Sequence, residues 1–97
     1  IVMSETLETI KAVCRVWKSG NKNPILIFPE DVDPRRYTVG MWEEVGQHGD
    51  GDPYGVVQKT RLATDEETEY VRKMYERHYQ CKLKMQKRMK INWRTAI

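Results

Sequence analysis

Two histidines and two cysteines are the side chains of this sequence that could take part in nucleophilic or metal chemistry. His78 and Cys81 lie three residues apart, a spacing that on a helix would place a base beside a thiol. A nucleophilic thiol also needs a pocket and oxyanion donors, and the sequence shows no segment that would supply them. The spacing of Cys14, His48, His78 and Cys81 does not match a zinc site. We therefore expect no catalytic residue, no metal and no cofactor, with both cysteines reduced and buried.

The acidic and glycine-rich segments give no stronger signal for a bound ion or phosphate. Residues 46–55 contain four of the six glycines, and their spacing fits neither of the common phosphate-binding loops. Asp50 and Asp52 alternate as calcium ligands do, but Pro53 follows and the series stops. This composition is typical of turns, so we expect a loop here and no small-molecule substrate.

The positive charge of the last third of the chain is the strongest chemical signal. Residues 70–97 contain nine Lys or Arg and one acid, Glu76, which gives this part a net charge of +8 in a chain of net charge +3. Such cations pair with phosphates and release counterions, while interleaved Tyr and Trp stack on exposed bases. The predicted RNA-binding residues are Lys73, Arg77, Lys84, Lys87, Arg88, Lys90 and Arg94. The alternative is a solvated helix face whose cations only keep the chain soluble.

The elements before this basic part are predicted to be one helix and a short extended middle segment. Apolar residues recur at spacings of three and four over 7–17, between a capping Ser4 and the stop signal of Gly20. Ile25 to Phe28 lie between two prolines and predict a short buried strand or an extended anchor. Residues 38–45 are ambiguous, and residues 56–62 predict a second strand or an extended lead-in to the last helix.

The basic part itself is predicted to be one long helix. Thr64 and Glu67 match a capping box, and no proline or glycine follows them up to the end of the chain. We therefore expect a mostly α protein with two helices, a short extended middle segment and a long basic C-terminal helix over 64–94. At 97 residues the chain predicts a single small domain, with a compact part over 1–63.

One side of the predicted long helix is apolar and rich in methionine. The first predicted helix, against which it could pack, would be about half as long. The end of the long helix would therefore extend beyond that helix and expose apolar side chains. Methionine makes such a surface adaptable to a foreign helix. The predicted partner-binding residues are Met74, Met85, Met89 and Trp93. Packing of this side against the chain's own first helix is the alternative.

Residues 26–31 combine apolar and acidic side chains, and residues 64–69 begin a helix with a Glu-Glu-Thr-Glu run, before a basic helix that contains Tyr79, Lys82 and Lys84. With these segments the chain resembles a mitochondria-specific protein family of the large ribosomal subunit. The segments that carry the resemblance lie between about Pro24 and Lys90. It implies a mitochondrial, non-catalytic protein that contacts rRNA and neighbouring proteins. The phosphate contacts that it implies are Lys84, Lys87 and Arg88.

The function predicted from these observations is that of a structural subunit of a ribonucleoprotein, with rRNA and other subunits as partners. A protein–protein adaptor that docks through the methionine-rich side is the alternative. No apolar run approaches the length of about 20 residues that spans a membrane. The predicted location is the mitochondrion, or otherwise the cell interior. The chain begins with Ile1, which leaves open a segment removed before it.

Overall fold

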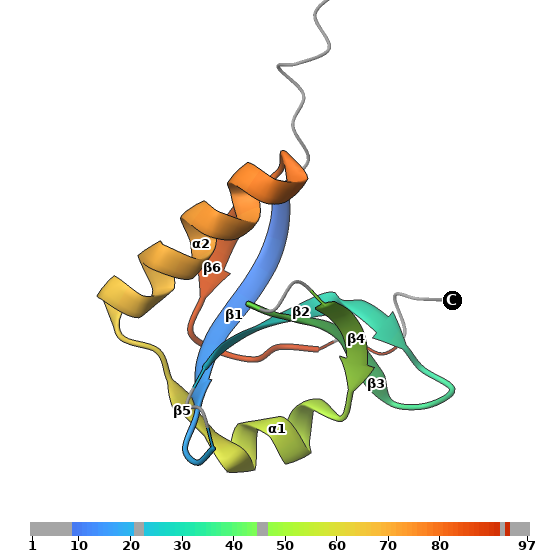
Figure 1. The fold of residues 1–97 in the computed structure, drawn as a ribbon. Helices are drawn as coiled ribbons and strands as arrows, with labels where there is room; N and C mark the ends of the chain where they lie inside the picture. The colour runs from blue at the N-terminus through green and yellow to red at the C-terminus, as the bar shows by residue number, and fades with distance from the viewer. Residues whose placement is uncertain (1–8, 21–22, 45–46, 92, 94–97) are drawn as a thin grey trace, which may run out of the picture.

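A computed structural model describes residues 9–20, 23–44, 47–91 and 93, and shows a six-stranded sheet with two helices (Figure 1). Strands hold more of these residues than helices do. The elements in chain order are β1 (Thr9–Trp17), β2 (Pro24–Asp33), β3 (Thr38–Glu43), β4 (Gln47–Gly51), α1 (Pro53–Lys59), β5 (Thr60–Leu62), α2 (Asp65–Tyr79) and β6 (Lys82–Gln86). The prediction of a mostly α protein is therefore wrong.

Strand β1 is the centre of the sheet. The strands follow the order β4-β3-β2-β1-β5, and β6 also pairs with β1. Strand β2 pairs with β1 in antiparallel register through Val13 and Ile27. The other edge of β1 is shared, because β5 pairs with its last residues and β6 runs parallel to its first residues. Helix α2 connects β5 to β6 and crosses one face of the sheet (Figure 1).

The first predicted helix is strand β1, and the reason lies in its burial on both faces. Ala12 and Cys14 point to one core while Val13 points to the other, so the strand is a nearly continuous apolar run without simple alternation. Such a run also satisfies helical spacing, which is why periodicity alone does not separate the two structures. The β-branched Val13 and Val16 favour the strand.

The predicted long helix over 64–94 is also wrong, because α2 ends at Tyr79. Gln80 takes the left-handed conformation, with φ of 52°, and this reverses the chain without a glycine. The next residues alternate between exposed lysine and the inward-facing Leu83, and form β6 as the edge partner of β1. The basic residues are thus divided among a helix, a strand and the segment after it.

The middle of the chain contains more strand and helix than predicted. The strand expected at Ile25 to Phe28 is confirmed and extends to Asp33, with a bulge after Phe28. The predicted loop over 46–55 contains β4, which pairs with β3, and the beginning of α1. Asp52 caps α1 by accepting a hydrogen bond from the Tyr54 amide, and a proline occupies the first turn.

The two faces of the sheet carry separate apolar cores. The first core lies under α2, whose Val71 and Tyr75 are buried against Leu26, Phe28 and Trp42. The second core lies on the opposite face, where Val56 of α1 and the segment after β6 cover the strands. The residues buried in the second core are Val13, Ile25, Ile27, Val39 and Met41. Burial on both faces explains how a short chain excludes water from its central strands.

Both cysteines are free and buried, as expected. Burial in the first core raises the pKa of the Cys14 thiol to about 11, which keeps it protonated at neutral pH. A protonated thiol is a poor nucleophile, so Cys14 serves the core as a small apolar side chain.

Candidate anion-binding face of helix α2

The beginning of α2 is held by a complete capping box. The Thr64 hydroxyl accepts a hydrogen bond from the Glu67 amide at 3.1 Å, and the Glu67 carboxylate accepts one from the Thr64 amide at 2.8 Å. The predicted capping box is therefore confirmed. Arg61 of β5 donates two hydrogen bonds of 2.9 Å to the same carboxylate, and mainly this contact lowers the Glu67 pKa to about 2.

One side of α2 balances its charges internally. Arg72 donates two hydrogen bonds to Glu69, at 2.8 and 2.7 Å, and one to Glu76 at 2.8 Å. These contacts raise the pKa of Arg72 and lower the pKa of Glu69. The second oxygen of Glu76 accepts a hydrogen bond from the Leu83 amide at 2.7 Å, which ties the helix to β6. This side therefore holds the structure together and offers no free cation.

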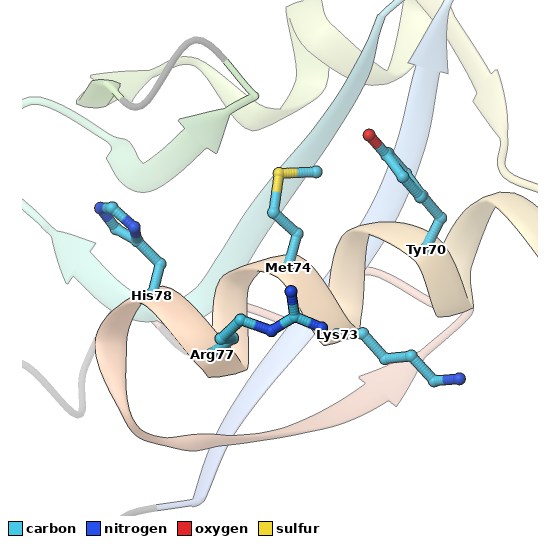
Figure 2. A pocket seen from close by; sticks show the side chains of 5 residues that line it. All are labelled: Tyr70, Lys73, Met74, Arg77 and His78. Atoms are coloured by element: carbon cyan, nitrogen blue, oxygen red, sulfur yellow. The ribbon is translucent and has the colours of Figure 1, made fainter.

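The other side of α2 borders a hollow of about 540 Å³, shown in Figure 2. The hollow is lined by Tyr70, Lys73, Met74, Arg77 and His78. The picture shows Tyr70, Met74 and His78 rising from one ridge of the helix, with the two cations along the next ridge. Lys73 and Arg77 are four residues apart, which brings their side chains together on the helix surface. The hollow therefore joins an apolar ridge to a cationic one.

The two cations of the hollow are exposed and form no ion pair with any residue in the described part of the chain. Among the residues that the structure describes, the basic members of ion pairs are Lys11, Arg36, Arg61 and Arg72. The charge of Lys73 also lowers the pKa of Glu69, but less than Arg72 does, because Arg72 donates hydrogen bonds directly to that carboxylate. Arg77 has a lysine one turn before it and no acid at that distance on either side. Both cations are thus available to an anion from outside.

Tyr70 completes the hollow with an aromatic ring that is 57% exposed. Its hydroxyl donates a hydrogen bond to Glu44 at 3.0 Å, and this raises the pKa of Tyr70. The hydrogen bond holds the ring at the end of the hollow beside the cations. The sequence reasoning did not single out Tyr70, although its position one turn from two of the hollow residues could have indicated it.

The remaining predicted RNA-binding residues lie elsewhere in the structure. Lys84 is exposed on β6, where its register partner in β1 is another lysine, Lys11. Lys87, Arg88 and Lys90 are exposed on the segment after β6. Arg94 lies outside the described residues. The structure therefore brings Lys73 and Arg77 together, and it places Lys84, Lys87, Arg88 and Lys90 along the edge of the sheet and beyond it.

The predicted partner-binding residues are largely engaged within the chain itself. Met85 packs against the first core, while Met89 and Trp93 pack against the second. Met74 also packs against the first core and lines the hollow. The predicted helix overhang that would expose Met85, Met89 and Trp93 does not exist. These three residues follow α2 and lie in β6 and in the segment after it.

The histidines and cysteines do not form the catalytic pair that was considered. His78 lies exposed at the hollow and Cys81 is buried in the first core, on either side of the reversal at Gln80. His48 of β4 lies 3.0 Å from the Tyr75 hydroxyl, and Trp42 donates a hydrogen bond to Tyr79 at 3.0 Å. These contacts fix the edge strand and the first core against α2.

Two further features are absent from the described part of the chain. No group of three or more His, Cys, Asp or Glu side chains is placed to hold a metal ion there. Neither of the helices described has the length and apolar character needed to cross a bilayer. No protein-family model, curated protein or solved structure matches this chain.

Proposed function

We propose that this protein is a non-catalytic RNA-binding subunit of a ribonucleoprotein, and that the hollow of α2 contacts the RNA backbone. The observation that carries the proposal is the exposed pair Lys73 and Arg77, which form no ion pair among the described residues, whereas Arg72 of the same helix is held by two carboxylates. Two adjacent cations without partners repel one another, and an anion between them removes this cost.

The shape of the hollow supports RNA over a simple inorganic anion. Arg77 presents a planar guanidinium that matches phosphate oxygens, and Lys73 adds a second positive charge on the same ridge. The exposed ring of Tyr70 offers a surface on which a base stacks beside its phosphate. An RNA backbone supplies phosphates and bases together, and thus uses both ridges.

The edge of the sheet supplies a second basic area to the same partner. Lys11 and Lys84 are register neighbours on adjacent strands, and such like charges are unfavourable without a counterion. Lys11 has a loose ion pair with Glu30 at 3.5 Å, whereas Lys84 has none among the described residues. The exposed cations of the segment after β6, Lys87, Arg88 and Lys90, continue from this edge.

The ribosomal role and the mitochondrial location remain predictions that rest on the resemblance of short segments. Of those segments, the Glu-rich helix start is present as the first turn of α2. The long basic helix is not present, because the chain turns at Gln80 and continues as β6. The proposal made from the geometry is therefore RNA binding itself, and rRNA is the RNA that the resemblance suggests.

The test is the salt dependence of RNA binding for two variants of equal charge. We expect Lys73→Ala with Arg77→Ala to weaken binding and to reduce the slope of log K against log salt by about 1.4, since each phosphate contact contributes about 0.7 for single strands. The control is Lys18→Ala with Lys59→Ala, two exposed lysines near the far end of β1. Equal losses in both double variants would show that only the net charge matters, and would refute a site on α2.

An acidic protein segment is the second candidate partner of the hollow. The observation that favours it is the apolar ridge, where Met74 lies partly buried between two other side chains. A peptide with carboxylates and an apolar side chain would pack that side chain against Met74, whereas RNA would use only the Tyr70 ring of this ridge. Met74→Gln separates the candidates, because it should weaken a peptide anchor while leaving phosphate contacts and their salt slope unchanged.

A further inference from the structure

The turn between β2 and β3 presents an aromatic ring in an unfavourable backbone conformation. Tyr37 has φ of 56°, in the left-handed region that glycine and asparagine occupy readily and a tyrosine seldom does. Its side chain is nevertheless 63% exposed, so burial of the ring does not compensate for the backbone. A strained residue that remains exposed points to a role outside the fold.

Contacts on both sides of Tyr37 fix the position of the ring. Trp93 packs against it in a T-shaped arrangement, with ring centroids 5.4 Å apart and planes at 71°. Before it, Asp33 accepts a hydrogen bond from the Arg35 amide at 3.0 Å and closes the turn. The ring is therefore held in place while most of its surface stays open to solvent.

Two arginines accompany the ring on the same turn. Arg35 and Arg36 are both exposed, and the contact of Arg36 with Asp33 is long, at 3.9 Å, between largely exposed groups. Such a contact contributes little to stability and releases its arginine readily. Arg35 takes part in no ion pair among the described residues. The turn thus combines an open aromatic ring with two available guanidinium groups.

We propose that this turn binds an unpaired nucleotide of single-stranded RNA, whose base stacks on Tyr37 while Arg35 and Arg36 contact the flanking phosphates. Base stacking on an aromatic ring and phosphate pairing with arginine are the two means by which proteins hold single strands. The inference rests on the proposed RNA-binding function and adds a second site with a preference for unpaired bases.

The turn is a site separate from the hollow of α2. Figure 1 shows the turn between β2 and β3 projecting on the far side of the sheet from α2. A variant in the turn therefore leaves Lys73 and Arg77 unchanged, and the two sites can be tested independently. Duplex RNA has no unpaired base to offer, so it would contact only the cations of the hollow and of the basic edge.

The decisive variant is Tyr37→Asn, because asparagine accepts the left-handed conformation and preserves the turn. We expect binding of a labelled 12-nucleotide oligo-U to fall by about 5- to 160-fold, the range for loss of one stacked base. Binding of a 12-base-pair duplex should be unchanged. The matched control, Tyr37→Phe, retains the ring and should bind oligo-U as the unaltered protein does. Thermal unfolding of each variant checks that the fold persists.

Several outcomes would overturn this inference while leaving the proposed function in place, and one outcome would overturn both. Unchanged oligo-U binding by Tyr37→Asn, or an equal loss in Tyr37→Phe, would remove the stacking site but leave the hollow intact. Loss of binding to phosphatidylserine vesicles with no change for oligo-U would assign the turn to a lipid surface instead. If the unaltered protein bound neither RNA, the proposed function itself would fail, and this inference with it.

Discussion

Arg72 and Arg77 belong to the same helix and have opposite surroundings. Arg72 has a side chain that is 27% exposed and contacts two carboxylates, Glu69 and Glu76. Arg77 is exposed beside Lys73 and contacts no carboxylate among the described residues. The difference teaches that the net charge of a segment says little about binding, because a cation neutralised within the fold is not available to a partner.

The spacing of the acids creates this difference. Glu69 and Glu76 lie three residues before and four after Arg72, the two distances at which helix side chains meet. Arg77 has Lys73 at the corresponding distance before it, and the helix ends at Tyr79 before any acid could follow. The side of α2 that faces the sheet and its rim is therefore structural, and the outer side is free for a ligand.

The largest effect is expected on the side that faces the sheet. Tyr75 is 5% exposed and packs against Phe28 and Trp42, with ring centroids at 5.5 and 5.2 Å. Tyr75→Ala should lower the free energy of unfolding by about 3–5 kcal/mol, because it leaves a cavity in the first core. Urea denaturation measures this loss. Tyr75→Phe, which removes only the hydroxyl near His48, should cost less than about 1.5 kcal/mol.

The capping box should give the next largest effect. Glu67→Ala removes the contacts to Thr64 and Arg61 and should cost about 1 kcal/mol in urea denaturation. Glu67→Gln retains the reach to the Thr64 amide and should cost less. Equal losses for the two variants would mean that the ion pair with Arg61, and not the cap, dominates at this end of α2.

The same carboxylate should make stability depend on pH in acid. The Glu67 pKa falls from 4.5 to about 2 on folding, so its contribution is complete above pH 4.5 and is lost as the pH falls through 2. Unfolding temperatures measured between pH 5 and pH 2 should fall less steeply for Glu67→Gln than for the unaltered protein. An identical fall in both would show that other carboxylates control the acid transition.

Arg72 and Arg77 themselves provide the sharpest comparison and the smallest effects. Arg72→Ala should cost about 1 kcal/mol, because it removes two helix ion pairs and leaves Glu69 and Glu76 without their shared partner. Arg77→Ala should change stability by no more than about 0.5 kcal/mol, as exposed residues without partners usually do. If both variants were equally destabilised, Arg77 would have a structural partner and the hollow would lose its free cation.

The elements that could be predicted from the sequence are those determined by contacts between near neighbours. The capping box of Thr64 and Glu67 and the strand at Ile25 to Phe28 follow from adjacent residues and were correct. Strand β1 was missed because its partners β5 and β6 come from distant segments, and because α2 and the segment after β6 cover its two faces. Tertiary contacts of this kind override local spacing.

The end of α2 and the candidate site show the same limit. No glycine marks the reversal at Gln80, and only the alternation of lysine with Leu83 and Met85 indicated a strand there. Lys73 and Arg77, two of the residues predicted to bind RNA, line the same hollow of α2. The turn that carries Tyr37 was not predicted as a site, since its strain and exposure are visible only in three dimensions.

The parallel pairing of β1 with β6 has a consequence for how the chain folds during synthesis. Thr9 pairs with Lys82 and Val13 with Gln86. The pairing of the central strand is therefore completed only when a segment about 70 residues further along the chain has been translated. Until β6 leaves the ribosomal tunnel, that edge of β1 is unpaired and the first core lacks Leu83. A nascent chain paused within α2 would therefore expose a strand edge to chaperones or to aggregation, and folding would be completed only after residue 86 has emerged.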